Sequence, residues 1–235
     1  MKRKRARAPE LPPLSLVRRF DTYRLIPERF IDGGESVLRR IADSDEHLNE
    51  IFDLDHATNE RLWAENERLP GIGIQELVFG VPNYRIVNAA FCHAHPLGSR
   101  FNGPERGAWY AAFERETSES EVMFHKVLEF VETNWPEEEV VYRELLADFS
   151  GEFHDLRGDS CFEVYLDPDS YVASQALAER LLELGSLGVV YPSVRRPEGT
   201  CLACFRPAMV GHVRLGGRRV FHYRGDPSSS TWSDG

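Results

Sequence analysis

From about Gly73 to the C-terminus, the sequence consists of short β-rich runs separated by Gly- and Pro-containing breaks, with two amphipathic helical patterns among them. Runs of branched and aromatic residues between such breaks are typical of strands. The runs that we expect to form strands are residues 77–81, 84–87, 107–113, 140–155, 161–166, 188–192 and 201–205, with a hairpin over 212–223. Because helices and strands are interspersed, the pattern predicts an α+β fold with a mixed β-sheet.

The two helical patterns have recognisable ends. Residues 118–133 begin with Ser118-Glu119-Ser120-Glu121, which fits a capping box, and end before Asn134-Trp135-Pro136. The second pattern covers residues 174–184 and ends at Gly185, a residue suited to the left-handed position after a helix.

The N-terminal third has a different pattern. Residues 15–68 carry apolar side chains three and four positions apart among many charges, which predicts largely helical structure. Leu69-Pro70-Gly71 interrupts this pattern. The sequence therefore predicts a helical N-terminal extension over residues 1–75 and a domain over residues 76–235. Partner binding and homo-oligomerisation both remain open as roles for the extension.

Composition excludes several classes of protein. The 235 residues contain 42% hydrophobic residues, enough for a packed core, and no run of about eighteen apolar residues that would span a membrane. We therefore expect a soluble cytoplasmic protein. The net charge of −10 argues against direct nucleic-acid binding, which depends on Lys and Arg neutralising phosphates. The basic run at residues 2–7 is interpreted as a solvated tail.

The four cysteines are Cys92, Cys161, Cys201 and Cys204, too few for a disulfide scaffold. Cys201 and Cys204 have CxxC spacing, which raises the alternative of a zinc site. However, residues three apart in a strand point to opposite faces, so we expect buried thiols and no metal.

Three residues in the stretch 98–126 form the main candidate site. Arg100 lies in a loop, Tyr110 lies beside Trp109 in an expected strand, and Glu121 lies at an expected helix start. Neighbouring strand residues face opposite ways, so one aromatic ring can fill the core while the other lines a pocket. Glu121 has two interpretations: it closes the capping box, or it presents its charge into a cleft. A cation, an aromatic face and a carboxylate together suit a phosphate-bearing ligand with an aromatic leaving group.

Two further polar residues allow alternative interpretations. Arg85, within an expected strand, either points to solvent at a sheet edge or binds a carboxylate or phosphate. His125 follows Glu121 by one helical turn and is either a core histidine, which we favour, or a polar partner of Glu121. The sequence contains no Walker loop, GxSxG or HExxH motif.

Together these residues resemble the RES domain family over roughly residues 76–207. The segments that carry the resemblance are Tyr84-Arg85, Gly98-Ser99-Arg100-Phe101-Asn102, Trp109-Tyr110-Ala111-Ala112, Glu121, Ser174-Gln175-Ala176-Leu177 and residues 188–193 with Pro192-Ser193. Ser99 and Phe101 depart from the family's Gly and Trp at those positions. The residues before about 75 are not covered by the resemblance.

The resemblance implies an ADP-ribosyltransferase-like core and an enzyme that consumes NAD. Members are typically toxins of toxin–antitoxin pairs that cleave the nicotinamide–ribose bond, with phosphate or water as acceptor, and their antitoxins often contain a helix-turn-helix. The activity would be that of an NAD phosphorylase or glycohydrolase, a glycosyltransferase chemistry. The alternatives are a protein ADP-ribosyltransferase and a non-catalytic module that binds a nucleotide or a partner.

The resemblance also implies roles for individual residues. Glu121, Arg100 and Tyr110 would be catalytic. The residues expected to bind or orient NAD are Arg85, Asn102, Ser174, Gln175 and Ser193.

Overall fold

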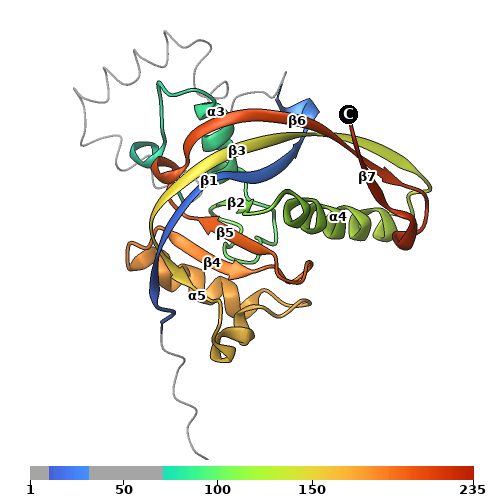
Figure 1. The fold of residues 1–235 in the computed structure, drawn as a ribbon. Helices are drawn as coiled ribbons and strands as arrows, with labels where there is room; N and C mark the ends of the chain where they lie inside the picture. Colours follow the sequence, from blue (N-terminus) through green and yellow to red (C-terminus); the bar gives the residue numbers. More distant parts are fainter. Residues whose placement is uncertain (1–10, 32–70) are drawn as a thin grey trace, which may run out of the picture.

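The computed structural model describes residues 11–31 and 71–235. Their core is a seven-stranded sheet with the order β1-β2-β5-β4-β3-β6-β7 (Figure 1). The strands are β1 (Leu14–Pro27), β2 (Trp109–Ala112), β3 (Glu138–Asp155), β4 (Gly188–Pro192), β5 (Thr200–Cys204), β6 (Gly211–Tyr223) and β7 (Thr231–Asp234). The α-helices are α3 (Tyr84–Cys92), α4 (Arg115–Glu132) and α5 (Val172–Glu183). Short 3-10 helices include η3 (Ile74–Glu76), η4 (Ser160–Tyr165) and η5 (Pro207–Met209).

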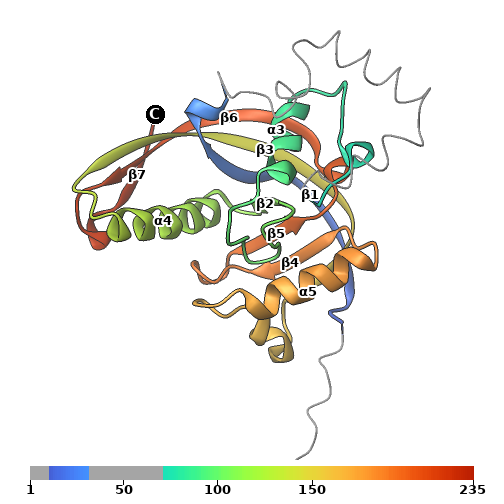
Figure 2. The ribbon, with the colours of Figure 1, turned by 180° about the vertical axis from the view of Figure 1, so that it is seen from behind.

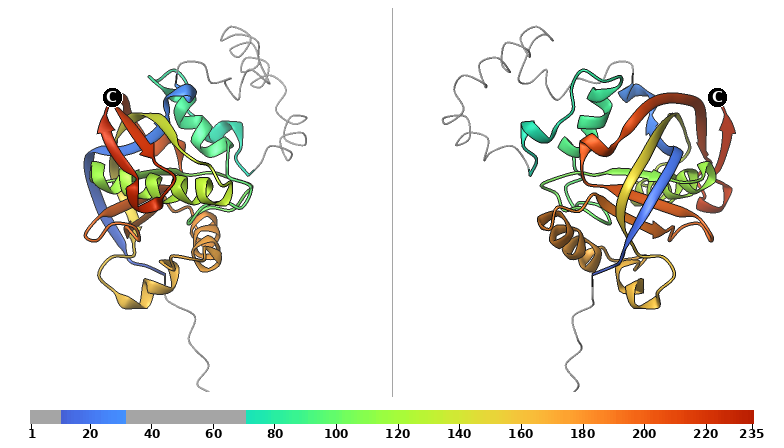
Figure 3. Two further views of the ribbon diagram at one scale, coloured as in Figure 1. Left: turned by 90° about the vertical axis from the view of Figure 1, so that its right-hand side faces the viewer. Right: turned by 60° about the vertical axis from the view of Figure 1, so that its left-hand side comes forward.

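The sheet closes on itself through β1. This strand pairs antiparallel with β3 along its length, and Tyr23 also pairs with Ala112 of β2. At its far end, β3 pairs in parallel with β4. Strands β1, β2, β5, β4 and β3 thus form a closed circuit, from which β6 and β7 extend. Figure 3 shows the long strands β1, β3 and β6 side by side, and Figures 1 and 2 show α4 under their arch and α5 beside β4.

Two core clusters lie on opposite faces of the short strands. Trp109 and Cys204 belong to one cluster, whereas Cys201 belongs to the other and Tyr110 packs against it. The alternation follows from the two-residue period of a strand. The two aromatic rings face opposite ways, as the sequence predicts: Trp109 lies in the core, and the Tyr110 ring is half-buried on the other face. A third cluster, around Phe130 and Phe221, packs α4 under β3 and β6.

The prediction of helix over residues 15–68 is wrong for β1, and residues 32–70 lie outside the described residues. Long-range pairing with β3 decides the conformation of β1, which buries Val17, Thr22 and Leu25. The register shifts between Arg19 and Thr22, and this irregularity hides the two-residue period in the sequence. Residues 14–27 are therefore part of the same sheet as the strands after residue 76.

Three predicted strands are also absent from the described fold. Residues 77–81 form no strand, residues 84–87 begin helix α3, and residues 161–166 fall mostly in η4. In α3 the buried side chains Val87 and Phe91 are four residues apart, which is a helical spacing. The strand prediction for residues 84–87 was wrong because a β-rich run of four residues is too short to show this period.

The predicted hairpin over 212–223 is instead one continuous strand, β6, paired with β3. Its two adjacent glycines lie beside Glu144 rather than in a turn. A Cβ at Gly216 would approach the Glu144 Cβ to 2.8 Å, and the Gly217 N–H donates to the Glu144 carboxylate at 3.0 Å. The glycines thus make room for a buried carboxylate at a register shift of the sheet.

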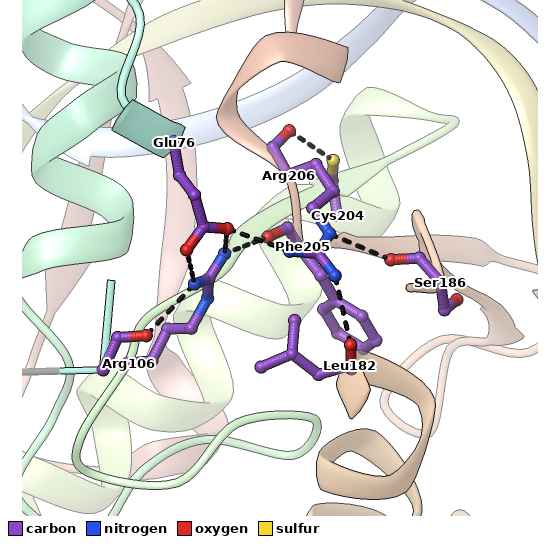
Figure 4. A network of polar contacts seen from close by, with 8 residues as sticks. Glu76, Arg106, Leu182, Ser186, Cys204, Phe205 and Arg206 are labelled. Carbon is purple, nitrogen blue, oxygen red and sulfur yellow. Dashed lines mark hydrogen bonds and ion pairs between the residues drawn. The ribbon is translucent and has the colours of Figure 1, made fainter. Parts of the chain in front are cut away.

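An ionic network joins η3 to the end of β5 (Figure 4). The Glu76 carboxylate accepts two hydrogen bonds from Arg106, both of 2.8 Å, and one of 2.9 Å from Arg206. Arg106 also donates to the carbonyl of Phe205, and Arg206 donates to that of Leu182 at the end of α5. The hydrogen bonds from Arg106 are the largest cause of the lowered pKa of Glu76. No helix of the described residues is long and apolar enough to cross a membrane.

Candidate active site

Glu121 and Ser193 meet beside one end of the three short strands β2, β5 and β4. Ala112 at the end of β2 pairs with Cys201 at the start of β5, and Cys201 pairs with Tyr191 near the end of β4. The chain that leaves β2 enters α4, which carries Glu121, and the chain that leaves β4 continues into Ser193. Strand order therefore brings together residues that are about 70 positions apart in the sequence.

Arg100 lies at the tip of a tight loop before β2. Ser99 and Asn102 close the loop through reciprocal main-chain hydrogen bonds of 2.9 and 3.3 Å. Gly98 has φ +70°, and a Cβ there would lie 2.2 Å from the Asn102 carbonyl oxygen. Only glycine fits this position, which explains the first residue of the Gly98–Asn102 motif.

Three polar side chains hold this loop in place. The Tyr110 hydroxyl accepts the Phe101 N–H at 2.9 Å and donates to Asn102 Oδ1 at 2.8 Å. Burial raises the pKa of Tyr110 well above its ordinary value, so the phenol keeps its proton. Gln175 Nε2 donates to the carbonyls of Leu97 and Ser99. Asn102 and Gln175, predicted to bind a ligand, thus have hydrogen bonds that position the Arg100 loop.

The Arg100 guanidinium is buried, with 7% of the residue exposed. It donates to the Asp167 carbonyl at 2.7 Å and lies 4.7 Å from the centre of the Tyr171 ring. Within the described residues it forms no ion pair with a carboxylate, in contrast to Arg106. A buried guanidinium without an anionic partner is suited to binding an anionic ligand.

Glu121 lies in the second turn of α4, because the helix begins three residues earlier than predicted, at Arg115 with Glu114 as its N-cap. The capping-box interpretation is therefore wrong: Ser118 is already inside the helix and buried. Instead, Glu121 Oε1 accepts a hydrogen bond of 2.6 Å from the Ser193 hydroxyl and a longer one of 3.7 Å from the Cys201 thiol. The carboxylate faces the loop after β4 rather than its own helix end.

The hydrogen bonds around Ser193 fix the orientation of its hydroxyl. Ser193 Oγ accepts the main-chain N–H groups of Arg195 and Arg196 at 3.1 and 3.0 Å. A hydroxyl has two acceptor positions and one proton, so the proton is directed to Glu121. Burial raises the pKa of the Cys201 thiol well above its ordinary value, so it also donates to Glu121. Among the described residues both bonds go to Oε1, which leaves Oε2 for a ligand.

His125 is exposed rather than a core residue, which corrects the favoured interpretation. Although His125 is exposed, the protein atoms around its imidazole reduce its hydration and so lower its pKa, and the charges of Arg195 and Arg100 act in the same direction. The charge of Glu121 opposes them. Glu121 and the two guanidiniums therefore all lie close enough to His125 to act on its charge.

Two predicted residues have other surroundings. Arg85 lies on α3 rather than on a strand, and it is exposed with Nε 3.3 Å from the Tyr84 hydroxyl. It takes no part in the hydrogen bonds that join Glu121 to Ser193 or Tyr110 to Asn102. Ser174 is buried at the start of α5 and donates to the Tyr171 carbonyl at 3.0 Å.

A hollow of about 620 Å³ at the other end of α4, beside Phe130 and Trp135, is lined by none of the candidate residues.

Sequence reasoning missed three residues of the site: Tyr171, Arg195 and Cys201. Arg195 follows Ser193 by two positions, and Cys201 is the second residue of β5, the strand paired with β4. Both residues therefore lie near a motif recognised in the sequence. Tyr171 directly precedes α5, where no local pattern indicates that its ring contacts Arg100.

The chain was compared with protein families, curated proteins and solved structures. The family model of the RES domain matches residues 77–224, more than half of the chain, and confirms the resemblance inferred from the sequence. A chain of the crystal structure of the M. tuberculosis MbcT–MbcA toxin–antitoxin complex is similar, with 19% identity and a TM-score of 0.40, covering 56% of this chain and 73% of that chain. No curated protein matches the sequence.

Proposed function

We propose that this chain, which belongs to the RES domain family, consumes NAD by cleaving the bond between nicotinamide and ribose. The observation that carries the proposal is the Glu121 carboxylate, which Ser193 and Cys201 hold through Oε1 while Oε2 stays available. Its charge and that of Arg100, a buried cation without a carboxylate partner among the described residues, both act on His125. An ADP-ribosyltransferase-like character of the fold is part of the same proposal.

Glu121 would act on the ribose. Cleavage of the glycosidic bond develops positive charge on the ribose ring, and a fixed carboxylate stabilises that charge. The Oε2 atom would accept a hydrogen bond from a ribose hydroxyl, and the Ser193 hydroxyl would keep the carboxylate in its orientation. Removing a preorganised group of this kind costs about 10²- to 10³-fold in rate.

Arg100 and Tyr110 would bind the rest of the substrate. The Arg100 guanidinium offers planar donors that match phosphate oxygens. The Tyr110 hydroxyl is engaged by the Arg100 loop, so its ring, half-buried beside Tyr191, is the part that would contact the nicotinamide or its ribose. Ser174 and Gln175 would orient the ligand through the segments that they hold.

The acceptor would be inorganic phosphate or water. As the glycosidic bond breaks, its electron pair returns to the ring nitrogen and neutralises the nicotinamide. An oxygen of the acceptor forms the new bond to the ribose and releases one proton. The same site with a protein side chain as acceptor would be a protein ADP-ribosyltransferase.

A biological role as a toxin is part of the proposal. Membership of the RES domain family implies a cognate antitoxin, often with a helix-turn-helix, that would bind this protein and block the site.

The test is incubation of the purified protein with NAD, with and without phosphate, followed by mass analysis of the products. We expect free nicotinamide together with ADP-ribose, or with phosphorylated ADP-ribose when phosphate is the acceptor. Glu121→Gln should lower the rate at least 100-fold, within the range for such groups. Glu116→Gln, which changes an exposed carboxylate on the same helix, is the matched control and should leave the rate unchanged. Intact NAD after incubation with folded wild-type protein would contradict the proposal.

A further inference from the structure

Arg195 is a second arginine at the site, and its contacts resemble those of Arg100. It lies in the loop after β4, with its guanidinium carbon 3.3 Å from the centre of the Phe124 ring. Its Nη2 donates to the Pro168 carbonyl at 2.6 Å, and its buried Nε has no hydrogen-bond partner. The main-chain N–H of the same residue is held by Ser193, so the backbone of Arg195 is fixed relative to Glu121.

Arg100 and Arg195 reach the same short segment from different parts of the chain. Arg100 donates to the carbonyl of Asp167, and Arg195 donates to that of the adjacent Pro168. Each guanidinium also lies over an aromatic ring, that of Tyr171 for Arg100 and that of Phe124 for Arg195. Two planar cations are thus oriented toward one region beside Glu121, each held by one carbonyl and one ring.

Neither arginine has an anionic partner within residues 11–31 and 71–235. In the same chain, Arg106 and Arg206 share the carboxylate of Glu76, and Arg219 pairs with Glu119. Arg100 is buried and Arg195 is half-buried, and withdrawing guanidinium charge from water without a counter-charge is unfavourable. Two like charges that act on the same imidazole also repel each other. Both terms are offset when an anion binds between them. The effect of both charges on His125 shows that they face a common region.

We propose that Arg195 and Arg100 together form the binding site for the phosphate oxygens of the ligand. Arg195 would then supply the second guanidinium that the sequence predicted at Arg85, which the structure places on α3. Phosphate oxygens are matched by the planar donors of arginine. The phosphate would belong either to the diphosphate of a nucleotide or to inorganic phosphate as the acceptor, and this identification of the ligand rests on the proposed function.

The experiment measures anion binding by calorimetry, which does not depend on turnover. Inorganic pyrophosphate and inorganic phosphate are titrated into wild-type protein, Arg195→Gln and Arg195→Lys. The matched control is Arg196→Gln, in the same loop, because the Arg196 side chain donates to Thr117 and not to residues 167–168. NAD is titrated into Glu121→Gln, alone and combined with Arg195→Gln, so that the dinucleotide stays intact.

We expect Arg195→Gln to weaken the binding of at least one anion tenfold or more, Arg195→Lys to weaken it less, and Arg196→Gln to change it less than twofold. Parallel losses for pyrophosphate and NAD would assign the site to the nucleotide diphosphate. A loss for inorganic phosphate alone would assign it to the acceptor. Absence of binding of both anions to wild-type protein, or equal effects of Arg195→Gln and Arg196→Gln, would overturn the proposal. If pyrophosphate binding depends on Arg195 but NAD is neither bound nor cleaved, the phosphate site stands and the proposed function fails.

Discussion

The Glu76 network gives a stability prediction whose magnitude follows from the structure. Glu76→Gln removes the charge that binds Arg106 through two hydrogen bonds of 2.8 Å and Arg206 through one of 2.9 Å. Loss of one partner of a buried ion pair costs about 3–5 kcal/mol. The Glu76 side chain is 30% exposed, and glutamine still accepts one bond, so we reduce the expected loss to about 2 kcal/mol.

The sign of the pH dependence follows from the direction of the pKa shift. The pKa of Glu76 is lowered in the folded protein, chiefly by its hydrogen bonds from Arg106. Its contribution is therefore fully present above the pKa of an unfolded glutamate, about 4.3, and is lost as the pH falls through the lower folded value. The difference in stability between wild-type protein and Glu76→Gln should accordingly shrink below about pH 4.

Urea unfolding at pH 7 and between pH 4 and 3 measures this difference. At pH 7 the loss of about 2 kcal/mol corresponds to a decrease in Tm of roughly 4–8 °C for a chain of this size. Glu163→Gln, an exposed carboxylate on η4, serves as the control and should change stability by less than about 0.5 kcal/mol. A loss for Glu76→Gln that is equally small, or that is the same at pH 7 and pH 3, would refute the reasoning.

Three further predictions concern the site. Ser193→Ala should lower kcat/KM for NAD about 10- to 100-fold, which corresponds to the loss of a hydrogen bond to a charged group. Ser193→Thr keeps a hydroxyl and should restore part of the activity. Equal rates for wild type and Ser193→Ala would contradict the geometry. Gly98→Ala should destabilise the protein by about 2 kcal/mol or more, because the residue has φ +70° and an alanine Cβ would meet a backbone oxygen at 2.2 Å. Thermal melting measures this loss, and an unchanged Tm would contradict the prediction. Burial raises the pKa of Cys201, so this thiol should resist thiol reagents at pH 7 until the protein unfolds. The exposed Cys161 should react first. Peptide mapping after brief labelling distinguishes the two cysteines.

The sequence allowed correct predictions where local patterns decide the structure. Helix α5 and its left-handed Gly185, the buried strand around Trp109 and the opposite orientation of Tyr110 all follow from helical or strand periodicity. Strand β1 could not be predicted in this way, because its conformation depends on pairing with β3, more than 100 residues later. The start of α4 was misplaced because Ser118 and Glu121 fit a capping box locally, while the helix in the structure begins at Arg115, with Glu114 at the N-cap position.

The candidate site shows the same division. The order of Arg100, Tyr110, Glu121 and Ser193 could be read from motifs, and the structure places Ser193 against Glu121 and Tyr110 against the Arg100 loop. The hydrogen-bond partners of these residues could not be read from the sequence, because the strand order β2-β5-β4 determines which residues become neighbours. Arg195 was missed for this reason: nothing near it in the sequence indicates that its guanidinium reaches residue 168.

The hydrogen bonds of the site fall into two groups, and this explains why Arg195 matters to its organisation. One group holds the Arg100 loop through Tyr110 and Gln175, and the other joins Glu121 to Ser193. In the described residues no hydrogen bond links the two groups directly. Arg100 and Arg195, one from each side, come closest to doing so, through the adjacent carbonyls of residues 167 and 168. A phosphate bound by both guanidiniums would therefore connect the Arg100 loop to the group that contains Glu121 and Ser193. The ribose would then be positioned by its covalent attachment to the phosphate rather than by contacts of the ribose with the protein.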